Sequence, residues 1–203
     1  MNDLQDIVGS IAVGGMVLLM LVIFNGNVME SAGMQTFKTT VQGNLTTVTN
    51  VIETDFRKMG YRLPSSLDSA IVYADSNRIK FKTDIDNNGT VDTVQYYIDT
   101  IKASLTPNPR DFVLHRIQNN QGQSMMIGIT RFKLQYFDAS DSLLTSNPVT
   151  ATGRIKSIKL SINMESTDRI LDNRRGGQLG NPMNDTSYVG AYWERTIKPK
   201  NLR

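Results

Sequence analysis

The strongest chemical pattern in the sequence is DIDNNGTVD, a stretch in the first half of the chain that begins at Asp84. It places carboxylates at Asp84, Asp86 and Asp92, with the side-chain oxygen of Asn88 and the backbone carbonyl of Thr90 between them. These groups match the ligand positions of a calcium-binding loop, in which oxygen atoms surround the ion. Asp84, Asp86, Asn88, Thr90 and Asp92 are therefore candidate metal ligands, and calcium is the candidate cofactor.

The match to a calcium loop is partial. Gln95 stands at the twelfth position, where an EF-hand has a bidentate glutamate, and the residues around it have the pattern of a strand. An EF-hand is therefore not expected, and a hairpin held by calcium would need Asp99 or another carboxylate to complete the shell. The alternative is an ordinary turn at Gly89, because Asp and Asn favour turns without any ion. The sequence leaves both interpretations open.

Candidate catalytic residues are scarce. The single histidine, His115, lies in an apolar run at residues 112–117 and is expected to pack or hydrogen-bond within a strand. The chain has no cysteine, and it contains no nucleophile elbow, P-loop or zinc-ligand spacing. We therefore predict that the protein is not an enzyme.

An apolar segment near the start of the chain predicts a membrane helix. Residues 7–24, IVGSIAVGGMVLLMLVIF, contain no charged residue, and a run of about 18 to 20 apolar residues matches the hydrocarbon thickness of a bilayer. The preceding MNDLQD carries Asp3 and Asp6 and no basic residue, so it lacks the positively charged start of a signal peptide. A retained transmembrane helix is predicted.

The next segment has the pattern of an amphipathic helix. Its apolar residues recur every three or four positions, as they do on one face of an α-helix; they are Met34, Phe37, Val41, Leu45, Val48, Ile52, Phe56 and Met59. We predict one continuous helix over residues 4–59, ended by Gly60 and Pro64. The alternative is a membrane anchor, a linker at residues 25–27 and a separate core helix.

The remainder of the chain has the period of β-strands. The predicted strands are residues 70–73, 78–82, 93–98, 112–117, 126–137 and 154–164. Residues 166–188, rich in Asn, Asp, Gly and Arg, are predicted to form an exposed loop. The predicted fold class is α+β, with a long N-terminal helix, half transmembrane and half amphipathic, packed on a mostly antiparallel sheet. The predicted domains are an assembly helix at residues 1–60 and a β-rich head at residues 61–203.

One run of residues carries a family resemblance. The sequence VIETDFRKMGYRLP, which begins at Val51, is similar to the type IV pilin superfamily, and within it to minor pilins of the PilW kind and to the J-type pseudopilin of type II secretion. The resemblance implies a filament subunit, with N-terminal helices bundled in the core and β heads on the surface. The implied partners are further copies of this chain or other pilin-like subunits in a helical filament. The implied location is the bacterial inner membrane before assembly and the cell surface afterwards.

The first residues depart from that family. Its members begin, after a cleaved basic leader, with a Phe-Thr-Leu-Ile-Glu-like start whose glutamate is at the fifth position. If Met1 is the first residue of the mature chain, Gln5 takes that position, and Asp3 or Asp6 must supply the acid. The candidate assembly residues are therefore Asp3, Gln5, Asp6, Gly14, Gly15, Val17 and Leu21.

Basic residues gather near the C-terminus. The chain has 22 Lys and Arg against 19 Asp and Glu, a formal charge of +3, and this basic group comprises Arg174, Arg175, Arg195, Lys198, Lys200 and Arg203. Such a group could bind DNA, anionic lipid or an acidic neighbouring subunit, but it lacks the interleaved aromatic residues of a single-strand-binding site. A solvated face is the favoured interpretation, and nucleic-acid binding is left uncertain. The alternative function is a singly anchored surface-binding protein whose head could depend on calcium.

Overall fold

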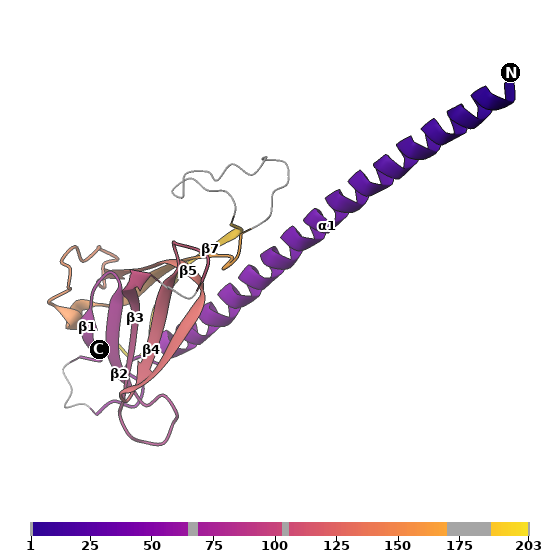
Figure 1. The fold of residues 1–203 in the computed structure, drawn as a ribbon. Coiled ribbons are helices and arrows are strands. Elements are labelled where there is room, and N and C mark those ends of the chain that lie inside the picture. The colour runs from indigo at the N-terminus through magenta and orange to yellow at the C-terminus, as the bar shows by residue number, and fades with distance from the viewer. Residues whose placement is uncertain (1, 65–68, 103–105, 170–187, 203) are drawn as a thin grey trace.

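A single long helix leads into the head of the molecule. The computed structural model describes residues 2–64, 69–102, 106–169 and 188–202. Helix α1 (Asn2–Arg57) extends far beyond the head at its N-terminal end and runs along the sheet at its C-terminal end (Figure 1). The prediction of one continuous helix is confirmed, with each end within two residues of the predicted one. The helix is unbroken through residues 25–27, so the alternative with a linker there is wrong.

The head is built on one antiparallel sheet of seven strands, in the order β1-β2-β3-β4-β5-β6-β7. Every strand pairs with its neighbours in the sequence, so the sheet is a simple meander. The strands are β1 (Ile71–Ala74), β2 (Arg78–Thr83), β3 (Asp92–Lys102), β4 (Phe112–Gln118), β5 (Gln121–Phe137), β6 (Ser157–Glu165) and β7 (Gly190–Ile197). The predicted α+β fold class is confirmed.

Several strands differ from the sequence-based prediction. Strand β5 begins five residues before its predicted start, and β3 ends four residues after its predicted end. Strand β6 begins three residues later than predicted because Thr152–Arg154 form a short 3-10 helix, η1. Strand β7 has no counterpart among the predicted ranges. Its first five residues alternate between exposed and half-buried, but Glu194, Arg195 and Thr196 are all exposed, so the alternation is lost in its second half. Pairing with β6 and contact with α1 define β7 instead. The predicted loop at residues 166–188 lies mostly outside the described residues.

The second half of α1 supplies one side of the hydrophobic core. Its apolar stripe is half-buried at Met34 and Phe37 and buried from Val41 to Met59. Phe56 is fully buried, and its ring makes edge-to-face contacts with Phe81 and Tyr96 at centroid distances of 5.9 Å and 5.8 Å. Such aromatic pairs add to the stabilisation from burial itself. The helix is therefore part of the core of the head.

A buried polar network joins the helix to the sheet. Arg116 Nε on β4 donates a hydrogen bond to Asp55 Oδ2 at 2.8 Å, and the hydroxyl of Tyr96 on β3 donates to the same oxygen at 2.5 Å. Burial, together with the charge of Asp55, raises the pKa of Tyr96 far above its usual value. The phenol therefore stays a neutral donor at physiological pH. The shared carboxylate fixes the rotation of α1 relative to the two strands.

The end of α1 is bonded to β2. Thr83 Oγ1 donates to the Lys58 carbonyl at 2.6 Å, and Gly60 N donates to the Lys82 carbonyl at 3.1 Å. Gly60 has φ of +76°, and a Cβ at this position would lie 2.5 Å from the Asn201 carbonyl oxygen. Only glycine combines this conformation with such a close approach. The predicted end of the helix at Gly60 is therefore confirmed, and the positive φ and close packing of this glycine explain it.

Replacing Phe56 with alanine tests the contribution of the helix to the core. We expect Phe56→Ala to destabilise the head by about 3 to 5 kcal/mol, because the buried ring leaves a cavity between α1 and the sheet. Denaturant unfolding of the full chain in detergent, followed by the fluorescence of the single tryptophan, measures the change. Val51→Ala is the matched control, since Val51 lies on the same helix and its side chain is 43% exposed. Equal stability of the two variants would contradict the packing described here.

Candidate functional site

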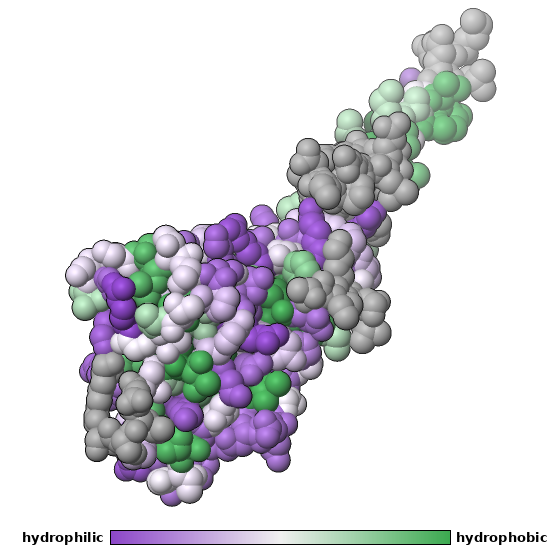
Figure 2. Space-filling model, turned by 90° about the vertical axis from the view of Figure 1, so that its left-hand side faces the viewer, coloured by the Kyte–Doolittle hydropathy of each residue, from purple (hydrophilic) through white to green (hydrophobic). Residues whose placement is uncertain are grey.

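The N-terminal half of α1 exposes a long apolar surface. Every large apolar side chain at residues 7–24 is at least 51% exposed. The apolar window of this helix has a mean hydropathy of 2.7, and none of it is buried within the chain. Figure 2 shows hydrophobic residues along the part of the helix that projects from the head, whose own surface is mostly polar. By length and composition this segment is suited to cross a membrane.

The candidate assembly residues fall on this projecting half. Val17 and Leu21 are exposed, and a Cβ added at Gly14 or Gly15 would meet nothing within 4 Å. Packing within this chain therefore gives no reason for either glycine. Asp6 is exposed as well. The remaining two candidates, Asp3 and Gln5, lie within α1, but their side chains are outside the described residues.

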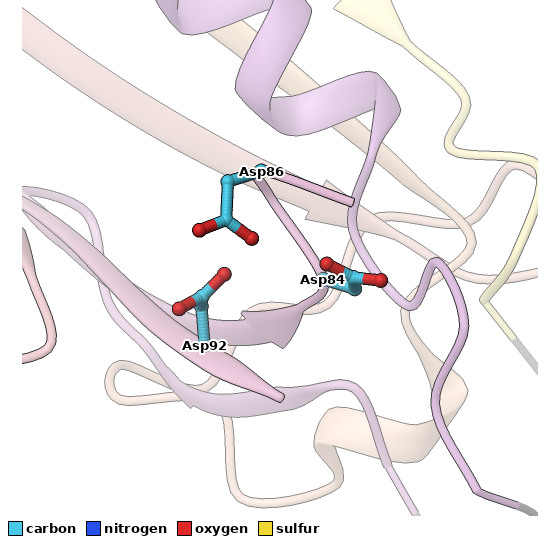
Figure 3. Close-up of side chains that lie close together, drawn as sticks. All are labelled: Asp84, Asp86 and Asp92. Atoms are coloured by element: carbon cyan, nitrogen blue, oxygen red, sulfur yellow. The ribbon is translucent and has the colours of Figure 1, made fainter. Parts of the chain in front are cut away.

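The second candidate site is the turn between β2 and β3. Strand pairing places Thr83 opposite Asp92, so Asp84 and Asp92 lie side by side at the mouth of the hairpin. Carboxylate oxygens of Asp84, Asp86 and Asp92 lie within 4.8 Å of one another, and the three side chains turn toward a common space (Figure 3). Asp84 and Asp92 are buried, with 1% and 2% exposure, whereas Asp86 is exposed. The hairpin register therefore brings together the three acids that the spacing singled out.

Backbone amides hold these carboxylates in place. Asp92 Oδ2 accepts a hydrogen bond from Ile85 N at 3.0 Å, and Asp84 Oδ2 accepts one from Gly89 N at 3.1 Å. Gly89 has φ of +85°, as the predicted sharp turn requires. The other oxygen of Asp84, Oδ1, is buried and has no hydrogen-bond partner within the part of the chain that the structure describes. Turn chemistry therefore accounts for most of this loop, but not for that oxygen.

Other candidate ligands are used differently. Asn88 Oδ1 accepts from Thr90 N at 2.7 Å and also contacts the Thr90 hydroxyl, while Asn88 Nδ2 donates to Asp86 at 2.8 Å. The amide of Asn88 thus braces the turn and presents no oxygen to the acidic cluster. Asp99 is wrong as the residue that completes the shell. It lies seven positions beyond Asp92 on the same strand, a distance of roughly 23 Å at about 3.3 Å per residue.

Sequence reasoning missed two basic residues at this loop. Arg62 Nη1 lies 3.4 Å from Asp84 Oδ2, and Lys58 Nζ donates to the Ile85 carbonyl at 2.7 Å. Both come from the segment just after α1, more than twenty residues earlier, so no local spacing could have indicated them. The acidic loop therefore lies at the junction between the helix and the head.

His115 lies in β4, as expected for a packed strand residue. Its ring stacks on Tyr97 at a centroid distance of 4.6 Å, and Ser124 Oγ lies 2.9 Å from Nδ1. Asp99 is 3.7 Å from Nε2, which is beyond hydrogen-bonding distance. Ser124, His115 and Asp99 thus include the residue types of a triad, but His115 Nε2 donates no hydrogen bond to Asp99 that would orient the ring as a catalytic base requires. The interpretation of His115 as a packed, hydrogen-bonded residue is confirmed.

Two described members of the basic C-terminal group form ion pairs. Arg195 Nη1 pairs with Glu53 Oε2 on α1 at 2.7 Å, and Lys198 Nζ pairs with Asp141 Oδ1 at 3.1 Å. Arg174, Arg175 and Arg203 lie outside the described residues. Arg195 and Lys198 therefore pair with acidic side chains of the same chain, which agrees with the predicted solvated face.

Comparison with known proteins yields a likeness of fold. No protein-family model matches the chain, and no curated protein sequence matches it. A type IV-like pilin from Thermus thermophilus is similar in structure, with a TM-score of 0.49 and 11% sequence identity. The match covers 80% of this chain and 98% of that one. At this identity no residue of that pilin can be assigned to a residue of this chain.

A polar cluster near Tyr188 contains an acid with a shifted pKa. Asp111 is buried, and burial raises its pKa from the usual 3.8 to about 6, although a hydrogen bond from Thr106 opposes the change. The nearby charge of Glu165 raises the pKa further, whereas Arg110 lowers it. Thr106 Oγ1 donates to Asp111 Oδ2 at 2.8 Å. The folded chain therefore takes up a proton here at a higher pH than the unfolded chain does.

The shift at Asp111 predicts how stability depends on pH. Between about pH 4 and pH 6 the folded state binds more protons at this site than the unfolded state, so the contribution of Asp111 to stability falls as pH rises. We expect Asp111→Asn to gain stability relative to the unmodified chain over this window, measured by thermal unfolding at several pH values. Asp138→Asn is a control whose effect has the opposite sign and falls below about pH 4, because amides of Ser142 and Ser140 lower the pKa of Asp138 from its usual 3.8. Parallel pH curves for Asp111→Asn and the unmodified chain would contradict the assignment.

Proposed function

We propose that this chain is a structural subunit of a type IV pilus-like or pseudopilin filament. In this proposal the projecting halves of α1 bundle in the filament core and the seven-stranded heads cover the outside. The observation that carries the proposal is a single unbroken helix whose first half is apolar and exposed and whose second half is buried in the head. The similarity of the run from Val51 to Pro64 to minor pilins and the J-type pseudopilin supports the same role.

The exposed apolar half must be covered by lipid or protein. Burying one Val, Leu, Ile, Met or Phe side chain gains about 1.5 to 3 kcal/mol, so the exposed set at residues 7–24 corresponds to tens of kcal/mol in total. A bilayer and a bundle of similar helices both provide an apolar environment for such a segment. We infer that the segment lies in the bacterial inner membrane before assembly and in the filament core afterwards, with the heads at the cell surface.

The attachment of the head suits a filament subunit. The second half of α1 is held to the sheet by its buried stripe. Two ion pairs add to this attachment, Asp55–Arg116 at 2.8 Å and Glu53–Arg195 at 2.7 Å. Bundling of the projecting halves would therefore set the position of each head on the filament surface. Neighbouring subunits could be copies of this chain or other pilin-like chains. A singly anchored surface-binding protein would share the membrane segment, but its helices would not contact one another.

A charge in the projecting half distinguishes these roles. We expect Val17→Arg to abolish filaments, because an unpaired charge in an apolar bundle costs several kcal/mol. The measurement is electron microscopy of material sheared from cells that produce the chain. Circular dichroism of the purified variant in detergent should show a folded head, since Val17 contacts no part of it.

The control makes the same substitution on the head. Val72→Arg also replaces an exposed valine, on the edge strand β1, and should leave filaments intact. Filaments of normal length from the Val17→Arg chain would overturn the proposal. Absence of filaments from the unmodified chain, with the chain found singly in the membrane, would favour the surface-binding role.

A further inference from the structure

The acidic loop between β2 and β3 carries three carboxylates beside two basic side chains, Lys58 and Arg62. Two buried carboxylates and one exposed carboxylate have oxygens within 4.8 Å of one another. The nearest cationic group, Arg62 Nη1, is 3.4 Å from Asp84 Oδ2, and its side chain is half-exposed. Carboxylates this close repel one another unless a cation or a proton lies between them. The loop is therefore arranged around a space that favours positive charge.

A separate observation points to a ligand in that space. Asp84 Oδ1 is buried and unpartnered among the residues that the structure describes, although Oδ2 of the same side chain has two partners. Figure 3 shows the carboxylate of Asp84 beside those of Asp86 and Asp92. A buried carboxylate oxygen without a partner is costly, and native proteins satisfy such atoms with donors, water or ions. An ion among the three carboxylates would satisfy this one.

We propose that Asp84, Asp86 and Asp92 bind one calcium ion, and that this ion fastens the end of α1 to the head. The ligands are hard oxygen donors on a flexible turn, which suit the variable geometry of calcium. Magnesium requires a tighter octahedral shell and gives up its water reluctantly, so it binds such a loop poorly. With no acid at the twelfth position, the affinity falls in the range of extracellular modules, about 10⁻⁴ to 10⁻³ M.

The position of the loop explains the effect on the helix. Asp84 N donates to the Tyr61 carbonyl at 3.1 Å, and Lys58 Nζ donates to the Ile85 carbonyl at 2.7 Å. Both contacts join the chain just after α1 to the residues that flank the proposed ion. An ion that holds the loop therefore also holds the segment through which the helix enters the head. This proposal stands independently of filament assembly.

Thermal unfolding of the full chain in detergent tests the ion. At a calcium concentration about one hundred times Kd, we expect the melting temperature to rise by about 5 to 10 °C over its value in chelator. Magnesium at the same concentration should give a much smaller rise. Asp86→Asn should weaken calcium binding at least about tenfold, measured by calorimetry. Asp86 is chosen because it is exposed, so its replacement removes a ligand without disturbing the core.

Asp141→Asn provides the matched control. It makes the same change of charge in another exposed turn, beside Lys198, and should leave the calcium response unchanged. An equal melting temperature in calcium and in chelator for the unmodified chain would overturn the proposal. So would a calcium response of unchanged size in the Asp86→Asn chain.

Hydrogen exchange tests the link to the helix. Calcium should slow exchange of the Gly60 and Asp84 amides, which donate to Lys82 and Tyr61 across the junction. Asp86→Asn should reduce that protection at the same calcium concentration while leaving exchange in β5 and β6 unchanged. A melting shift without any protection at these two amides would overturn the claim that the ion fastens the helix.

Discussion

Phe56 contacts the rings of Phe81 and Tyr96 at the centre of the head, and the apolar stripe around it is buried against the sheet. This contact surface has one polar interruption, where Asp55 accepts hydrogen bonds from Arg116 and Tyr96. The apolar contacts supply most of the stabilisation, because burial of large side chains is the dominant favourable contribution to folding. The buried ion pair supplies orientation, since its partners satisfy one another only at one rotation of the helix.

The remaining architecture follows from where that helix is held. The meander sheet leaves one face for the second half of α1, and β7 joins the sheet beside it. Because α1 is unbroken, the first half must project from the head with its apolar side chains exposed. One helix thus serves two environments. Its second half behaves as a core helix of a soluble domain, and its first half is suited to lipid or to other helices.

The junction between the end of α1 and the sheet is compact and polar. Gly60 adopts a conformation that other residues rarely adopt, against the backbone of Asn201, and the acidic loop beside it contacts Lys58 and Arg62. The same loop brings three carboxylates together near one orphaned oxygen. The junction thus combines tight turns with several charged side chains.

The sequence by itself determined the elements and much of their chemistry. A spacing of three and four residues from Met34 to Met59 marks a helix face, because side chains recur on that period, and alternating residues mark most strands. It also identified the acids of the β2–β3 turn, since ligands of one loop are close in sequence. Tertiary structure alone decided that Asn88 braces the turn, that Asp99 lies far along β3 and that Arg62 faces Asp84. It also decided that β7 is a strand. The physical reason is separation along the chain: local periodicity reports on neighbours within a few residues, whereas these pairings join segments that only folding brings together.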